Sequence, residues 1–432
     1  MFDYMKKVLL AVALFQFSFF NFQFAYAQHD SIPETDSLIV QRLEEWQDLK
    51  LGFMMHWGIY AQWGVVESWI ICNETWIVRD SLGADSRPVK GHPGSDYIAY
   101  KQAYQSLNKT FNPTHFNPQF WAEAARRAGM KYVVFTTKHH DGFCMFDTRQ
   151  TDYGSTGKDC PAQTDFTRGV VNAFREQEMW IGLYFSKPDW HNDDYWAHEW
   201  ATPDRNVNYT IADHPDRWQR FCDFTYNQIY ELTHNYGRID ILWLDGGWVR
   251  PEWSVNDETR PWLGCSGQVQ ELDMQRLARI ARETNPQLLV VDRSVGGKYE
   301  NYRTPEQQVP DTLLPYPWET CMTLGDSWSY SPTDHYKSAR QLIHLLCDIV
   351  AKGGNLLLNV GPDADGNLPV GAVRRMEELG RWLDQNGYAI YATRPLYPYS
   401  DGNVRYTQSK DSSHRYAITL LDEYPYATVK EL

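Results

Sequence analysis

The chain has 432 residues and a net charge of −14, from 55 acidic and 41 basic side chains. This excess of negative charge disfavours nucleic acid and anionic lipid as partners. Seven cysteines are present without a C-x-x-C pair, and their scattered spacing predicts neither a zinc or redox site nor a disulfide framework.

Residues 1–27 have the pattern of a secretory signal peptide. Lys6 and Lys7 precede the apolar run 8–14, and Ala25-Tyr26-Ala27 ends the segment with an A-x-A cleavage sequence. The apolar run is shorter than the roughly 20 residues that a membrane span needs. We therefore expect an exported protein, periplasmic or secreted, with no membrane insertion.

Beyond this segment, short apolar runs alternate with helical patterns, as in successive βα units. The pattern predicts strands at 51–56, 132–136, 180–185, 239–244, 288–291 and 355–359, and helices at 118–128, 165–177, 215–236, 269–283, 337–351 and 370–386. Six or more such units favour a β/α barrel over an open sheet. No G-x-G-x-x-G or Walker sequence opens a helix, which disfavours dinucleotide and P-loop binding.

Polar side chains follow five of the predicted strands directly. These strand ends carry His56, His139-His140-Asp141, Ser186, Asp245 and Asp292-Arg293. In a β/α barrel the carboxyl ends of the strands meet on one face, where active sites lie. Asp245 is the most informative of them, because it ends a strongly apolar strand and precedes two glycines. Such a carboxylate serves as a nucleophile, a metal ligand or a helix N-cap, and the residues alone leave all three open.

Six segments together resemble the α-L-fucosidases of glycoside hydrolase family 29, and they occur in that family's order. They are FMMHWGIY at 53–60, TKHHDGFC at 137–144, GLYFS at 182–186, LWLD at 242–245, WETC at 318–321 and GGNLLLNVGP at 353–362. The resemblance implies a somewhat irregular (β/α)8-like, TIM-type barrel over 28–392, followed by the start of a C-terminal β-rich segment at 393–432.

The same resemblance implies a retaining exo-α-L-fucosidase that removes terminal fucose from oligosaccharides or glycoconjugates and needs no metal or cofactor. Retention needs two carboxyl groups about 5–5.5 Å apart, one as nucleophile and one as acid/base. The resemblance assigns the nucleophile to Asp245. For the acid/base it favours Glu306, with Glu319 as the alternative, because the sequence does not show which of them reaches the glycosidic oxygen.

The resemblance also nominates nine side chains for contact with the sugar, where imidazole, guanidinium and aromatic groups suit a ring bearing hydroxyls. They are His56, Glu67, Trp69, His139, His140, Tyr184, Trp243, Arg293 and Trp328. Many members have Glu-Trp after the His-Trp-Gly motif, whereas this chain has Val66-Glu67-Ser68-Trp69, so Glu74 is an alternative to Glu67. This departure leaves a related sugar such as α-L-galactose open. A catalytically silent sugar-binding barrel is a further hypothesis, which the presence of two candidate carboxyl groups disfavours.

Overall fold

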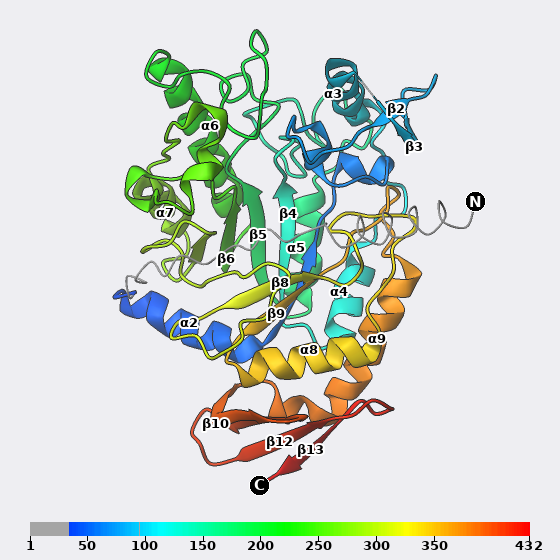
Figure 1. Cartoon of the computed structure of the whole chain (residues 1–432), viewed down its shortest axis with the longest axis vertical. Helices are drawn as coiled ribbons and strands as arrows, with labels where there is room; N and C mark the ends of the chain where they lie inside the picture. The colour runs from blue at the N-terminus through cyan, green and yellow to red at the C-terminus, as the bar shows by residue number, and fades with distance from the viewer. Residues whose placement is uncertain (1–33, 95) are drawn as a thin grey trace, which may run out of the picture.

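The computed structural model describes residues 34–94 and 96–432, and the predicted signal peptide at 1–27 lies outside them (Figure 1). Its largest sheet has seven parallel strands in the order β7-β6-β5-β4-β1-β9-β8 and curls round on itself. These strands are β1 (Leu51–Met55), β4 (Tyr132–Lys138), β5 (Trp180–Ser186), β6 (Ile241–Asp245), β7 (Leu289–Asp292), β8 (Glu319–Thr323) and β9 (Asn355–Asn359). The predicted barrel-like α/β fold is therefore confirmed.

Helices surround this sheet (Figure 1). The α-helices are α2 (Ser37–Leu49), α3 (Tyr97–Gln105), α4 (Pro118–Arg127), α5 (Phe166–Glu176), α6 (Pro215–His234), α7 (Met274–Arg282), α8 (Ala339–Ala351) and α9 (Val370–Asn386), and the 3-10 helices are η1 (Ile59–Gln62), η2 (Ser68–Ile71), η3 (Ser106–Lys109), η4 (Glu252–Ser254), η5 (Arg260–Ser266) and η6 (Gly387–Ala389). Each predicted helix is present, but α7 starts five residues later than predicted. Asp273 sets that start, since its side chain accepts a hydrogen bond from the Arg276 amide and caps the helix.

An irregular segment, residues 300–307, lies between β7 and β8, the two edge strands of the sheet. The Asn301 amide donates to the Val290 carbonyl (3.0 Å), and the Gln307 amide donates to the Cys321 carbonyl (2.9 Å). The segment therefore hydrogen-bonds to both edges and closes the barrel where an eighth strand would stand in a regular one. We call it the closing segment.

The interior of the barrel is filled by side chains. Its buried layer contains Met54, Tyr132, Val134, Tyr184, Ile241, Trp243, Leu289, Val291, Tyr302, Cys321 and Leu357. Gly52 makes room for one of them, because a Cβ at that position would lie 2.3 Å from the ring of Tyr132. A packed interior of this kind leaves the face at the carboxyl ends of the strands as the place for a substrate.

The last 40 residues form a separate antiparallel sheet below the barrel (Figure 1). Its strands are β10 (Thr393–Asp401), β11 (Val404–Ser409), β12 (Arg415–Leu420) and β13 (Ala427–Glu431), in that order. The sheet packs on α8 and α9: Arg405 pairs with Asp348 of α8 at 2.5 Å, and the Trp382 indole of α9 donates to the Ala427 carbonyl at 2.9 Å. The β-rich C-terminal segment predicted from the sequence is thus present.

A two-stranded ribbon, β2 (Asp80–Leu82) and β3 (Pro88–Pro93), lies at the other end of the molecule (Figure 1).

All seven cysteines are in the described part of the chain and none forms a disulfide. Six are buried and Cys265 is exposed. Within residues 34–94 and 96–432, no helix has the length and apolar character that crossing a membrane requires.

Candidate active site

The carboxyl ends of β1, β4, β5, β6 and β7 bring the polar strand ends together, and Asp245 stands at their centre. Its backbone is fixed by the Lys187 amide, which donates to the Asp245 carbonyl at 2.9 Å. The next residue, Gly246, has φ 91°, and a Cβ there would lie 2.3 Å from the ring of Pro188. A left-handed backbone and this close approach both require glycine after Asp245.

Two side chains hydrogen-bond to the Asp245 carboxylate, and a third lies beside it. The Tyr184 hydroxyl donates to Oδ2 at 2.9 Å, Arg293 Nη1 lies 3.1 Å from Oδ1, and His140 Nε2 lies 3.7 Å from Oδ2. Burial alone would raise the pKa of Asp245. The charge of Arg293, with His140, the Gly246 amide and the Tyr184 hydroxyl, outweighs burial and holds that pKa below its usual range. Asp245 is therefore ionised at neutral pH.

Arg293 joins Asp245 to Glu306. While its Nη1 faces Asp245, its Nη2 makes an ion pair and hydrogen bond with Glu306 Oε2. Its Nε donates to the Thr304 hydroxyl at 3.2 Å, and the guanidinium lies 5.0 Å from the ring centroid of Trp243. The side chain of Glu306 is 23 % exposed, more than those of Asp245 (17 %) and Arg293 (11 %). Glu306 is therefore the more open of the two bridged carboxyl groups.

Glu319 lies in a different place from Glu306. It is the first residue of β8 and is fully buried in the barrel interior. The Tyr132 hydroxyl donates to its Oε2 at 2.5 Å, and the Trp243 indole donates to its Oε1 at 3.2 Å. Burial raises the pKa of Glu319 to about 7 despite these hydrogen bonds. Both of its oxygens are thus occupied by buried side chains.

His56 is oriented by Asn359, the last residue of β9. Asn359 Oδ1 lies 2.8 Å from His56 Nδ1 and accepts the His56 amide at 3.1 Å, while its Nδ2 donates to the Trp328 carbonyl at 2.7 Å. The ring of Trp328 lies 5.1 Å from the ring of His56. Burial lowers the pKa of His56 to about 4, so the imidazole is neutral and its Nε2 stays available to a ligand.

His139 and His140 follow β4, and both are buried. Ser68 hydrogen-bonds His139 Nδ1, and the ring of His139 stacks on Tyr184 at 5.4 Å. Burial lowers the pKa of His139 well below its usual value and that of His140 to about 3. Two neutral imidazoles therefore stand beside an ionised carboxylate.

Glu67 is the buried carboxyl group of the Val66–Trp69 region. Its Oε1 accepts the Ser329 amide at 3.2 Å, and burial raises its pKa to about 8, with the nearby charges of Glu306 and Asp245 adding to the effect. Glu74, the alternative, is held by Arg205 at 2.5 Å. Glu67 is thus close enough to Asp245 and Glu306 for their charges to raise its pKa, whereas Glu74 forms an ion pair with Arg205.

Trp69 belongs to an aromatic cluster at the edge of this site. Its ring lies 5.3 Å from His140, and Arg205 covers it at 4.7 Å. The other rings within 5.6 Å of Trp69 are those of Trp76, Trp190 and Trp248. Eight of the nine side chains nominated as sugar contacts are therefore linked to Asp245 and Glu306 through ion pairs, hydrogen bonds and ring contacts, and Glu67 adjoins them at the Ser329 amide, one residue after Trp328.

Three residues that orient this network were not nominated from the sequence. They are Ser68, Lys187 and Asn359, which hold His139, the Asp245 backbone and His56 respectively. Lys187 also pairs with the buried Asp292, one residue before Arg293, at 2.5 Å. Asn359 lies in GGNLLLNVGP at 353–362, so the sequence could have identified it. Ser68 lies inside the Val66-Glu67-Ser68-Trp69 stretch, and Lys187 directly follows GLYFS at 182–186.

A metal site at His139-His140-Asp141 has no support from this geometry. The Asp141 carboxylate accepts the Tyr104 hydroxyl at 2.6 Å, and no group of three or more His, Cys, Asp or Glu side chains among the described residues has an arrangement that would hold a metal ion. The cluster instead places an ionised carboxylate, a second carboxyl group and neutral imidazoles around one guanidinium. Displacement at a carbon bearing an oxygen leaving group is within the chemistry of such a set.

Comparison with known proteins identifies the class. The family model for α-L-fucosidase matches residues 19–388 of this chain. The α-L-fucosidase isoenzyme 1 from Paenibacillus thiaminolyticus superimposes with a TM-score of 0.71 at 31 % identity, covering 90 % of this chain and 85 % of that one. These matches show that the protein is a glycoside hydrolase.

Two further relatives agree with this class. The α-fucosidase from Thermotoga maritima, solved in complex with fucose, has a TM-score of 0.64 and 27 % identity, with 88 % of this chain and 83 % of that one covered. An α-L-fucosidase from Branchiostoma floridae is 29 % identical over 402 residues, which are 90 % of this chain and 81 % of the relative. The chain belongs to the α-L-fucosidase family, as the six sequence segments predicted.

The position of Glu319 gives a prediction for stability. Its pKa of about 7 in the folded protein exceeds the roughly 4.3 expected when unfolded, so folding favours the protonated form. The stabilisation is complete below the unfolded pKa and is lost as the pH rises through about 7. We expect the unfolding free energy of the wild type to fall relative to Glu319→Gln between pH 5 and 7.5, by up to roughly 1.4 kcal/mol per pH unit. Urea unfolding at several pH values measures this, and parallel curves for the two proteins would contradict it.

Proposed function

We propose that Asp245 is the nucleophile and Glu306 the acid/base of a retaining exo-α-L-fucosidase acting on terminal α-L-fucose of oligosaccharides or glycoconjugates. The observation that carries the proposal is the contact of one guanidinium, that of Arg293, with both carboxyl groups. One guanidinium keeps the two carboxyl groups near each other, and a retaining enzyme needs its two carboxyl groups about 5–5.5 Å apart.

The reaction proceeds in two displacements. In the first, an Asp245 oxygen attacks the anomeric carbon, the bond to the leaving oxygen breaks, and Glu306 gives that oxygen its proton. In the second, Glu306 takes a proton from water, the water oxygen attacks the anomeric carbon, and Asp245 leaves as a carboxylate. Negative charge therefore passes from Asp245 to Glu306 and back. Arg293 touches both groups and balances the charge at each stage.

Neutral imidazoles suit the recognition of sugar hydroxyls. Burial keeps His56, His139 and His140 uncharged, so each ring offers one donor and one acceptor nitrogen. Asn359 and Ser68 engage the Nδ1 atoms of the first two rings, which leaves their Nε2 atoms for the substrate. Trp328 beside His56 offers an apolar surface suited to the C5 methyl group that distinguishes fucose from galactose.

The choice of Glu306 over Glu319 rests on access. A general acid must reach the glycosidic oxygen, and the side chain of Glu306 is 23 % exposed, whereas Glu319 is fully buried. Tyr132 and Trp243 also occupy the oxygens of Glu319. These contacts support Glu319 as a structural carboxyl group beneath the site, with Trp243 between it and Arg293.

Export is part of the proposal, and it rests on the signal-peptide pattern of residues 1–27. We expect the mature protein to be recovered outside the cytoplasm of the producing cell, with Gln28 as its first residue after cleavage. N-terminal sequencing of the fractionated protein tests this. Retention of the full-length chain in the cytoplasm would contradict it.

Replacement of the nucleophile is the first catalytic test. Asp245→Ala removes the group that forms the glycosyl–enzyme bond, so we expect kcat/KM on an aryl α-L-fucoside to fall by roughly 10⁴-fold or more. Asp422→Ala, in the exposed connection between β12 and β13, is the matched control and should leave kcat/KM unchanged. An Asp245→Ala enzyme with wild-type activity would overturn the mechanism. Assay of the wild type on the matching aryl α-L-galactoside decides the sugar, with fucoside expected to be strongly preferred.

Replacement of the acid/base separates the two candidate carboxyl groups. We expect Glu306→Ala to lose roughly 10²–10⁴-fold in rate on substrates with poor leaving groups and much less on those with good ones, because only a poor leaving group needs the proton. Azide should restore its activity and give a glycosyl azide of retained configuration. Glu319→Gln should show neither the leaving-group dependence nor azide rescue. The reverse pattern would transfer the role to Glu319.

A further inference from the structure

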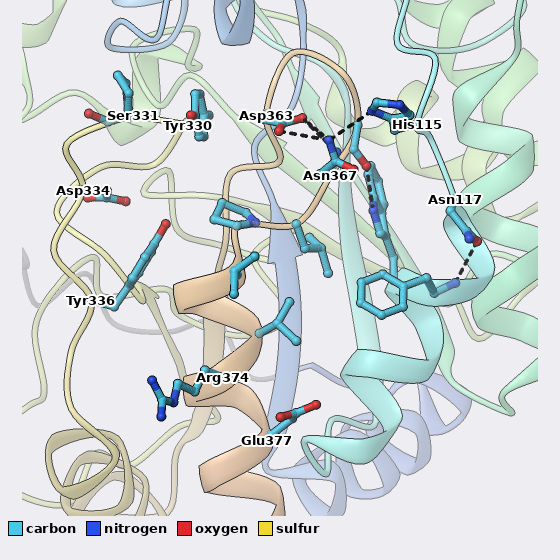
Figure 2. A pocket seen from close by; sticks show the side chains of 18 residues that line it. His115, Asn117, Tyr330, Ser331, Asp334, Tyr336, Asp363, Asn367, Arg374 and Glu377 are labelled. Atoms are coloured by element: carbon cyan, nitrogen blue, oxygen red, sulfur yellow. Dashed lines mark hydrogen bonds between the residues drawn. The ribbon is translucent and has the colours of Figure 1, made fainter.

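A groove of about 1030 Å³ lies at the rim of the barrel, between the first turns of α4 and α9 and the loop at 330–336 (Figure 2). The loop belongs to the connection from β8 to α8, and α9 is the next helix after β9. Two sides of the groove therefore come from connections that follow the carboxyl ends of strands. Those connections form the active-site face of a β/α barrel. Two of the connections that line the groove therefore belong to the face that carries the Asp245 site.

The groove and the Asp245 site share a wall. Trp328 stands beside His56, and two residues further along the chain Tyr330 lines the groove. The loop rests directly on the β9–α9 connection, because a Cβ on Gly361 would lie 2.4 Å from the backbone at Ser329 and Tyr330. The two sites are thus separated by only a few residues of backbone.

The lining combines aromatic rings with hydrogen-bonding groups. Tyr336 reaches from the loop toward α9, whose second turn carries the exposed Arg374, and Glu377 lies about one turn further on (Figure 2). Within the described residues, no hydrogen bond or ion pair engages the Tyr336 hydroxyl, the Arg374 guanidinium or the Glu377 carboxylate. Phe120 adds a ring that is 38 % exposed. Rings with free polar groups at their edges suit a flat ligand with C–H faces and many hydroxyls.

The charge of the groove lining restricts the class of ligand further. Asp334, Asp363 and Glu377 outnumber Arg374 in the lining, and the whole chain carries a charge of −14. An acidic glycan or a polyanion would be repelled from such a surface. A neutral saccharide meets no such penalty and can use both donors and acceptors of the groove.

We propose that this groove binds neutral sugar units of the oligosaccharide that carries the terminal fucose, beyond the residue that is cleaved. The proposal rests on the proposed function, since the substrate must be a glycan longer than one sugar. It makes Tyr336, Arg374 and Glu377 determinants of affinity for the remainder of the glycan. They take no part in bond cleavage.

The test compares a long and a short substrate on the same variants. A neutral pentasaccharide with one terminal α-L-fucose is the long substrate, and 4-nitrophenyl α-L-fucoside is the short one. We expect Tyr336→Ala to lower kcat/KM on the pentasaccharide roughly five- to tenfold through KM, as truncation of a contact aromatic does, with the aryl fucoside unchanged. Glu377→Gln and Arg374→Ala, on the helix surface, give a second measurement if Tyr336→Ala fails to fold. Tyr388→Ala, which is 52 % exposed on η6, is the matched surface control.

Binding without turnover separates this proposal from the proposed function. The fucose-free tetrasaccharide core should bind to the wild type in calorimetry and bind more weakly to Tyr336→Ala, whether or not the enzyme cleaves fucosides. Equal losses on the long and short substrates, no loss on either, or tighter binding of a sulfated core would each overturn the groove proposal. Failure to hydrolyse the aryl fucoside, with core binding intact, would instead count against the proposed function alone.

Discussion

The contact of Arg293 with both Asp245 and Glu306 is the interaction on which the site depends. Two carboxyl groups held close together in a partly buried site repel each other, and an unpaired buried charge is costly. One guanidinium with separate Nη atoms relieves both problems, because it offers each carboxyl group its own donor. Thr304 at Nε and the ring of Trp243 fix the guanidinium in turn.

The fold supplies these three groups from three adjoining places. Asp245 ends β6, Arg293 directly follows β7, and Glu306 lies on the closing segment beside β8. A regular eighth strand would place alternate side chains inside and outside the barrel. The irregular segment is anchored on both sides of Glu306, where the Cys321 amide donates to the Pro305 carbonyl at 3.2 Å and the Gln307 amide donates back to Cys321. The departure from a regular barrel is therefore what brings the second carboxyl group to Arg293.

Much of this architecture could be predicted from the sequence, because buried parallel strands are continuous apolar runs and their polar ends stand out. Asp245, Arg293, His56 and the histidine pair were all found in that way, with roles supplied by the family resemblance. β8 was missed as a strand because its sequence, Glu-Thr-Cys-Met-Thr, carries polar residues into the barrel interior. No local pattern showed the pairing of Glu306 with Cys321, which depends on contacts between separate segments. For the same reason the sequence left Glu306 and Glu319 as alternatives, which differ in burial and in the side chains that contact them.

Two further ion pairs are buried at the carboxyl ends of the strands. Lys187 pairs with Asp292 between the ends of β5 and β7, and Lys138 pairs with Asp189 at 3.1 Å. Such pairs contribute little net stability, since the cost of removing two charges from water offsets their attraction, yet losing one partner leaves the other charge stranded. Their effect is on geometry: Lys187 binds both the Asp245 backbone and the residue before Arg293. In the proposed mechanism charge passes between two carboxyl groups around the cation of Arg293, and the Lys187–Asp292 pair fixes the backbone next to that cation.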